Sequence, residues 1–287
     1  MLWVVRDWMA GMEKIVHIIP LGHEYDRAVK PFDDSNADRV YILTRWRDSS
    51  AAVKMVDDQR YYANKVRDTL KKKGIDVKCE PVNLFDFLEV TKSISRIIVK
   101  EKVEGNRIRM NMSAAGRLTS VAATLVGMHH DVQVYYVRAD GYPDDPDERK
   151  KHGLSVCDSN EITYLTNLKF DMPDPIGMNI LVFLCEKGRK VSTRDLLEKL
   201  NELQIDGFQE LFCDNIELSD DDKRKDRNKE LVSRRIRQSR QLMKLNKTIL
   251  EKLEKSGYVR REKIGRNVYV SITNTGTYVA YLSGLVN

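Results

Sequence analysis

Five short apolar runs divide the first half of the chain, and a polar or amphipathic stretch separates each run from the next. Two of these stretches repeat apolar residues at spacings of three and four, which is typical of helices that pack on one side. They are Val53–Lys73, which Gly74 ends, and the stretch from Phe87 to Ile98. The five expected strands are Ile15–Pro20, Arg39–Thr44, Ile75–Val82, Ile108–Met112 and Val132–Val137. This alternation predicts an α/β fold with a parallel sheet and helices on both of its faces.

The fourth expected strand ends in small polar residues and leads directly into an apolar helix, Leu118–Met128. Backbone N–H groups at a helix N-terminus carry partial positive charge, so the loop between strand and helix can hold phosphate or another anion. Asn111 and Ser113 can add hydrogen bonds, and Arg117 can add a charge. The candidate ligand residues of this loop are Asn111, Ser113, Ala114, Ala115, Gly116 and Arg117.

Ligands of parallel sheets bind at the carboxyl ends of the strands, where the strand order switches. Gly22 and His23 follow the first expected strand, and Arg45 follows the second, so they join the candidate site. Gly141-Tyr142 follows the fifth strand. His23 is either a ligand contact or a simple surface histidine, and the sequence favours neither.

The chain changes character after residue 145. Residues 143–151 are polar and interrupted by proline, which predicts a loop, and Gly153–Asp171 contains short apolar alternation that predicts a returning strand and a connector. Pro173-Asp174-Pro175 marks a boundary. We therefore expect a ligand-sensing domain over residues 13–145, a connector over 146–173 and a second domain over 174–287.

The second domain begins with an apolar helix, Ile176–Cys185, and Ser192-Thr193-Arg194-Asp195 is a capping-box start for another helix. An insertion from about Gln204 to Lys229 follows, acidic first and then basic. Leu231–Lys255 predicts a long helix with an apolar seam, and Tyr258–Ile272 predicts a hairpin that turns at Gly265-Arg266-Asn267.

Positive charge is concentrated in this second domain. Residues 223–266 hold 17 Lys and Arg against five Asp and Glu, whereas the whole chain has a net charge of +6. Such a block suggests a polyanionic partner, although a charge run is more often only a solvated helix face. The candidate DNA contacts are Arg234, Arg237, Arg240, Lys244 and Lys247 on the helix, with Arg260, Arg261, Lys263 and Arg266 on the hairpin.

Several classes of protein find no support in the sequence. The familiar motifs for dinucleotides, P-loop nucleotides, zinc proteases and serine hydrolases are absent. The four cysteines are far apart, and His129-His130 has the wrong spacing for two ligands on one helix face, so we expect no metal and no cofactor. We find no signal peptide or membrane-spanning run, expect residues 1–12 to be an extension outside the fold, and expect a cytoplasmic protein.

Two motifs in the first half resemble those of the CRISPR-associated Rossmann-fold (CARF) domains. The first is Leu21-Gly22-His23, and the second is Asn111-Met112-Ser113-Ala114-Ala115-Gly116-Arg117. The resemblance covers roughly residues 13–145 and implies a Rossmann-like sensor of cyclic oligoadenylates that works as a homodimer. Ala114-Ala115 departs from it, because many members carry Thr or Gly there.

The second domain resembles the winged helix-turn-helix of prokaryotic regulators, and the whole chain resembles regulators of the archaeal type. The matching sequence is Ile249-Leu250-Glu251-Lys252-Leu253-Glu254-Lys255-Ser256-Gly257-Tyr258-Val259, followed by Gly265-Arg266 and Ile272-Thr273-Asn274-Thr275-Gly276. This resemblance implies binding to double-stranded DNA, and the insertion before the basic helix departs from it.

Three functional hypotheses follow. The first is a transcriptional regulator controlled by a cyclic oligoadenylate, with the four-membered ring favoured. The second is a ring nuclease that cleaves this ligand, with Ser113 and Arg117 positioning it and His23 as the one evident base. The third is a regulator that senses another nucleotide.

Overall fold

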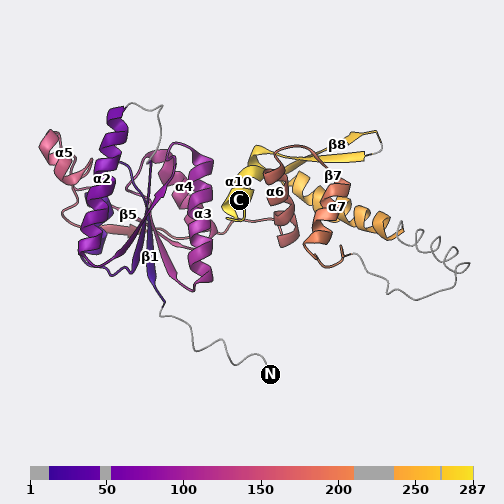
Figure 1. The fold of residues 1–287 in the computed structure, drawn as a ribbon, viewed down its shortest axis with the longest axis horizontal. Coiled ribbons are helices and arrows are strands. Elements are labelled where there is room, and N and C mark those ends of the chain that lie inside the picture. The colour runs from indigo at the N-terminus through magenta and orange to yellow at the C-terminus, as the bar shows by residue number, and fades with distance from the viewer. Residues whose placement is uncertain (1–12, 46–52, 210–235, 266, 287) are drawn as a thin grey trace, which may run out of the picture. The chain divides into compact units, whose positions relative to one another are not determined.

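The computed structural model describes residues 13–45, 53–209, 236–265 and 267–286, and it divides into two compact units that meet between Phe170 and Asp171 (Figure 1). Each unit has its own apolar core. None of the described helices combines the length and the apolar character that crossing a membrane requires.

The first unit is built on a six-stranded sheet with the order β3-β2-β1-β4-β5-β6. Five strands are parallel, and β6 alone runs antiparallel, beside β5. Their bounds are β1 (Ile15–Pro20), β2 (Arg39–Thr44), β3 (Asp76–Pro81), β4 (Arg107–Asn111), β5 (Gln133–Val137) and β6 (Ile162–Tyr164). The predicted α/β fold with a parallel sheet is confirmed, and the switch in strand order falls between β1 and β4.

Helices cover both faces of this sheet, with α2 on one side and α3 and α4 on the other (Figure 1). The helices are α1 (Asp26–Val29), the 3-10 turn η1 (Lys30–Phe32), α2 (Val53–Lys72), α3 (Phe87–Val103) and α4 (Arg117–His129). In β1 and β2 every residue after the first is buried, as expected for central strands enclosed on both faces. Ile19, Val40 and Ile42 pack in one cluster with Val66 and Leu70 of α2.

A histidine lies inside this core. His17 of β1 is 2% exposed, and its Nδ1 lies 3.0 Å from the hydroxyl oxygen of Tyr135. Burial, assisted by the positive charge of Arg109, lowers the pKa of His17 to about 3, so the ring is neutral at physiological pH.

At the amino ends of the strands, a buried carboxylate fastens three elements. Glu101 of α3 is fully buried and accepts hydrogen bonds from Arg39 Nη1 at 2.8 Å and from Tyr41 Oη at 2.5 Å, both on β2. Asn106, just before β4, donates to its other oxygen at 2.6 Å. Burial by itself raises the pKa of Glu101, but these hydrogen bonds together bring it below its usual value.

The segment expected as a connector belongs to the first unit, which extends to Phe170 rather than ending at residue 145. The expected loop contains a helix, α5 (Pro146–His152), which Asp145 caps by accepting from the N–H groups of Asp147 and Glu148. This short helix buries none of its own residues and is held through its carbonyls, as Tyr62 Oη donates to Arg149 O at 2.6 Å. The returning strand predicted within 153–171 is present as β6.

Gly153 joins α5 to the loop after β1. Its φ is +86°, and it pairs with Glu24 in an isolated antiparallel bridge. A Cβ there would lie 2.5 Å from Tyr25 N and 2.6 Å from His23 O, so no larger residue fits without displacing backbone.

The second unit is a helical domain with a three-stranded sheet in the order β7-β9-β8. Its elements are α6 (Pro175–Lys187), β7 (Val191–Ser192), α7 (Thr193–Glu202), a helix over 236–244 that continues as the π-helical turn η2 (Leu245–Leu250) and α9 (Glu251–Lys255), β8 (Val259–Ile264), β9 (Asn267–Ile272) and α10 (Asn274–Leu282). The predicted capping box at Ser192 and Asp195 is confirmed, and so is the hairpin. Residues 1–12, and the part of the predicted insertion from 210 onward, lie outside the described residues.

Gly153→Ala is expected to destabilise the protein by more than about 2 kcal/mol, because it adds a backbone clash to the strain of a positive φ. Gly105→Ala is the matched control, since Gly105 has φ +76° with nothing within 4 Å of its would-be Cβ. That control should lose only about 1 kcal/mol. Urea unfolding monitored by circular dichroism measures the free energy of unfolding of both variants. Equal losses would contradict the close packing of Gly153 against the loop after β1.

Candidate ligand and nucleic-acid sites

The carboxyl ends of β1 and β4 meet at the switch point, where their loops are hydrogen-bonded to each other. Gly22 N donates to Ala114 O at 2.8 Å. A Cβ on Gly22 would be 3.6 Å from that oxygen and 3.7 Å from Ala115 Cα, which is ordinary van der Waals contact. The structure thus brings together the two motifs that the sequence places at this edge of the sheet.

Asn111 and Ser113 shape the loop from inside. Asn111 is fully buried, and its Nδ2 donates to Arg27 O at 2.8 Å, while its Oδ1 accepts from Ser113 N at 2.9 Å and Ser113 Oγ at 2.7 Å. Ser113 Oγ also accepts from Val137 N at 3.1 Å. These side chains, predicted as direct ligand hydrogen-bond partners, are engaged within the chain and fix the backbone of β4 as it enters the loop.

The exposed part of the loop is the start of α4. Gly116 is its N-cap with φ −67° and ψ +161°, and no side chain caps the first turn. Gly116 and Arg117 are exposed, Ala115 is half-buried and Ala114 is buried. Uncapped N–H groups beside an exposed guanidinium form an arrangement suited to an anion.

Arg45 and His23 stand at neighbouring strand ends. The Arg45 guanidinium carbon lies 5.9 Å from the centroid of the Phe85 ring, and the His23 ring centroid lies 6.0 Å from that of Tyr62. Both residues are half-buried.

Sequence reasoning missed Arg27, which lies on α1 directly behind the loop. Its Nη1 is 3.3 Å from Ser113 O, its Nη2 donates to Tyr136 Oη at 3.0 Å, and its guanidinium lies 5.3 Å from the centroid of the Tyr136 ring. Nη1 is also 3.4 Å from Glu24 Oε1. Arg27 and Ser113 are 86 positions apart, and the polar stretch that holds Arg27 has no periodicity that would single it out.

Glu24 has an unusual environment. It is 6% exposed and accepts a hydrogen bond from Ser155 Oγ at 2.9 Å. Burial raises the pKa of Glu24 to about 7, against the opposing effects of the Arg27 charge and the Ser155 hydrogen bond.

The rim beside the loop is apolar. Phe85, Leu118 and Val121 are 54%, 49% and 53% exposed, and Thr119 Oγ1 donates to Leu84 O at 2.6 Å, which ties the start of α4 to the loop before α3. The 113–117 loop lines none of three cavities found among the described residues of this single chain.

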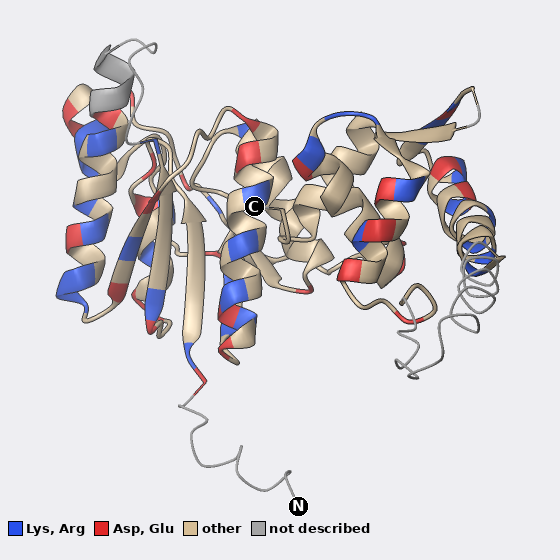
Figure 2. Cartoon of the chain, turned by 45° about the vertical axis from the view of Figure 1, so that its right-hand side comes forward, with Lys and Arg blue, Asp and Glu red and all other residues tan. Residues whose placement is uncertain are grey.

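The predicted basic helix of the second unit buries Leu245, Ile249 and Leu253 in the domain core. Figure 2 marks several Lys and Arg positions of this helix in blue. Arg240, Lys244 and Lys247 are exposed and Arg237 is half-buried, whereas Arg234 lies outside the described residues. Lys244 Nζ also lies 4.9 Å from the centroid of the Phe208 ring.

On the hairpin, neighbouring arginines have different surroundings. Arg260 and Lys263 are exposed, and Arg266 lies outside the described residues. Arg261 is paired with Glu254 of α9, with Nη2 2.5 Å and Nε 2.8 Å from Glu254 Oε2, and its Nη1 donates to Asn246 O at 3.2 Å. Hydrogen bonding by Arg261 lowers the pKa of Glu254. Arg261, predicted as a phosphate contact, instead fastens β8 to the basic helix.

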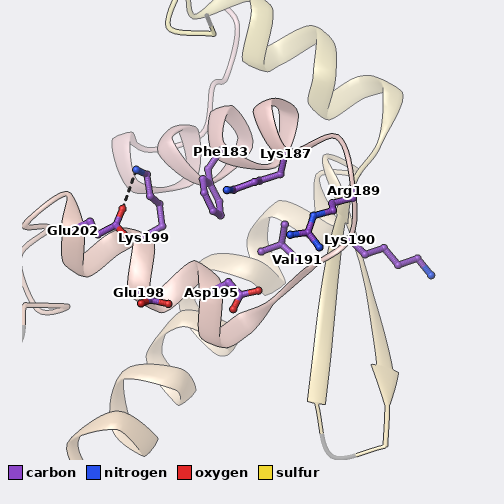
Figure 3. Close-up of a pocket in the computed structure, with 9 residues that line it drawn as sticks. All are labelled: Phe183, Lys187, Arg189, Lys190, Val191, Asp195, Glu198, Lys199 and Glu202. Carbon is purple, nitrogen blue, oxygen red and sulfur yellow. Dashed lines mark hydrogen bonds and ion pairs between the residues drawn. The ribbon is translucent and has the colours of Figure 1, made fainter.

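A separate cavity of about 350 Å³ lies between α6, β7 and α7 (Figure 3). Phe183 is at its centre, with the ammonium groups of Lys187 and Lys199 at 5.2 and 5.8 Å from the ring centroid. Its remaining lining residues are Arg189, Lys190, Val191, Asp195, Glu198 and Glu202. Four basic and three acidic side chains nearly balance, so this cavity lacks the charge bias of the basic helix.

Within the part of the chain that the structure describes, no group of three or more His, Cys, Asp or Glu residues is placed to hold a metal ion. Cys79, Cys157 and Cys185 are free thiols.

Comparisons with known proteins match the two halves separately. Residues 15–142 match the family model described as "HFX_2341_N:-like, N-terminal", and residues 177–284 match the DUF6293 C-terminal winged helix domain. The protein therefore joins a Rossmann-like α/β domain to a winged helix domain. The predicted fold class, a Rossmann-like parallel-sheet domain followed by a winged helix domain, is confirmed.

Similar solved structures include Enterococcus italicus Csm6 bound to cyclic hexa-2′-fluoro-hexa-dAMP, with 12% identity, a TM-score of 0.41, and coverage of 67% of this chain and 51% of that chain. VC1899 from Vibrio cholerae has 15% identity and a TM-score of 0.38, with coverage of 94% of this chain and 66% of that chain. Can2 from Sulfobacillus thermosulfidooxidans in complex with cyclic tetra-adenylate has 14% identity and a TM-score of 0.36, with coverage of 71% of this chain and 55% of that chain. The chain thus spans between half and two thirds of the length of these solved chains. No curated protein matches.

Asn111→Ala is expected to destabilise the protein by about 2–3 kcal/mol, because it leaves the buried Arg27 carbonyl and Ser113 groups without partners. Ser120→Ala, three residues into α4, removes only a 3.2 Å bond to Gly116 O and should change stability by less than about 0.5 kcal/mol. Thermal and urea unfolding compare the two, and a small loss at Asn111 would show that the loop does not depend on its internal bonds.

Proposed function

We propose that this protein is a ligand-responsive DNA-binding regulator. Its first domain binds a cyclic oligoadenylate, with cyclic tetra-adenylate favoured, between two copies of the 113–117 loop in a homodimer. Its winged helix domain binds double-stranded DNA, and the bound ligand changes the affinity for DNA by favouring one arrangement of the dimer. The observation that carries the proposal is the uncapped start of α4, held open at the switch point by buried Asn111 and Ser113.

The loop offers the chemistry that such a ligand requires. Phosphodiester groups are anions, and they suit the N–H groups of the first turn of α4 together with Arg117. Phe85, exposed near the same edge, offers a face on which a base can stack. The identity of the ligand comes from the resemblance of the Gly22-His23 and Asn111–Arg117 motifs to CARF domains.

The apolar rim supports a dimer at the same place. Leu118 and Val121 are one helical turn apart on α4, directly after the loop, and both are about half exposed. Burying them against a second copy places the two loops near a common twofold axis, where one symmetric ring can contact both.

The winged helix domain supports the DNA partner. A basic helix with a buried apolar seam suits the major groove, and the exposure of Arg260 and Lys263 on the wing supports the proposal that they contact phosphates.

Calorimetry with cyclic tri-, tetra- and hexa-adenylate is expected to show tightest binding of the four-membered ring, at one ring for two chains. The recovered ring should be intact, because a regulator does not consume its ligand. Linear products would favour the ring nuclease, and failure of all three rings to bind would favour a regulator of another nucleotide.

Val121→Glu should give a monomer that no longer binds the ring, and Val103→Glu, at an 84% exposed valine of α3, is its control.

Arg260→Ala and Arg261→Ala are expected to weaken DNA binding in different ways. Loss of a phosphate contact at Arg260 should reduce the slope of log K against log salt by about 0.9. Arg261→Ala should weaken binding with little change in slope, because this guanidinium is paired with Glu254 and positions the wing. Fluorescence anisotropy at several salt concentrations measures both slopes, and equal losses of slope would place Arg261 on the DNA.

A further inference from the structure

Arg27 and Glu24 form a buried ion pair behind the 113–117 loop. The proposed function gives this ion pair no role. Their side chains are 11% and 8% exposed. Arg27 Nη1 lies between Glu24 Oε1 at 3.4 Å and Ser113 O at 3.3 Å. One guanidinium therefore contacts both the carboxylate and the first carbonyl of the loop.

This pair is incompletely satisfied. Glu24 Oε2 and Arg27 Nε are both buried, and neither has a hydrogen-bond partner. A buried carboxylate with an unpaired oxygen is costly to keep ionised, which agrees with the raised pKa of Glu24 at about 7. When Glu24 takes up a proton, the positive charge of Arg27 loses its counter-ion while the guanidinium remains beside the loop.

We propose that Arg27 is the positioning residue of the 113–117 loop, and that an anion bound on this loop is held more tightly when Glu24 carries a proton. The inference rests on the proposed function only in taking a cyclic oligoadenylate as that anion. In addition, ligand binding is coupled to protonation of Glu24, a residue that does not contact the ligand.

The other ionisable groups facing Glu24 come from three segments. Asp26 is on α1, Tyr62 is on α2, and Cys157 lies after α5, while His152 of α5 reaches Asp26 Oδ2 with its Nδ1 at 2.7 Å. Burial raises the pKa of Tyr62, and it raises that of Cys157 to about 12, so both keep their protons near neutral pH.

The direction of the effect follows from linkage. A bound anion disfavours a second negative charge nearby, so it raises the pKa of Glu24 further. Well below pH 7 Glu24 is protonated with and without ligand, and affinity does not depend on its titration. As pH rises through the pKa of the free protein, the ligand-free state loses its proton first, so affinity falls until the bound state also loses it.

The experiment measures binding of cyclic tetra-adenylate by calorimetry from pH 6 to 8.5, in two buffers of different ionisation enthalpy that report proton uptake. The phosphodiesters of this probe do not titrate in that range. Affinity should fall about three- to tenfold between pH 6.5 and 8, with a fraction of a proton taken up at pH 7.5. Glu24→Gln keeps an acceptor for Ser155 and should bind with no such pH dependence.

Four further variants separate a positioning role of Arg27 from general damage to the fold. Glu101→Gln alters a buried carboxylate at the opposite ends of the strands and should keep the pH dependence, as should His152→Asn, which retains a donor for Asp26. Arg27→Gln should bind about tenfold or more weakly at every pH, and Arg27→Lys should restore part of this loss while the fold, checked by circular dichroism, is unchanged.

Binding of the ring without pH dependence, or a pH dependence that Glu24→Gln retains, would overturn this inference and leave the proposed function standing. If the ring does not bind at any pH, the proposed function fails, and sulfate becomes the probe. Carbon NMR of labelled glutamate then follows Glu24, which Glu24→Gln assigns. A higher titration midpoint with sulfate would support the link between the loop and Glu24, and an unchanged midpoint would overturn it.

Discussion

The first domain depends on one buried amide, the side chain of Asn111. It joins three parts of the chain that the parallel sheet brings to its switch point: the backbone of α1 through Arg27, the first residue of the ligand loop through Ser113, and β4 itself. Because both ends of the amide are used inside the protein, the loop backbone is set before any ligand arrives. A preorganised loop avoids much of the entropy that ordering would otherwise take from the binding energy.

The same division between fastening and contacting residues recurs in the winged helix domain. Arg260 faces solvent, and Arg261, its neighbour on β8, turns back to Glu254 and to the Asn246 carbonyl. Alternation along a strand produces this contrast, because successive side chains point to opposite faces. By composition alone, both arginines belong to one basic patch. In the fold, Arg260 lies on the surface, whereas Arg261 connects the hairpin to the basic helix.

The sequence predicts β1 and β2 well because both strands are buried after their first residue and are largely apolar. It predicts α5 wrongly as a loop, because that helix buries no side chain and is held through its own carbonyls by Tyr62. Arg27 was missed because its partners are far away in sequence, and no local pattern encodes such contacts. The candidate ligand residues of the 113–117 loop stay a prediction, and the structure adds that the buried Asn111 amide bonds to Arg27 and Ser113 within the chain.

The π-helical turn at Leu245–Leu250 changes how the basic helix can meet a partner. A wider turn acts as an inserted residue, and each residue advances a helix by about 100°. Lys247 lies inside this turn, so its direction around the helix axis relative to Arg240 and Lys244 differs from that in a regular α-helix. In the DNA contact proposed above, the local geometry of this one turn would therefore help to set how the basic side chains meet the groove.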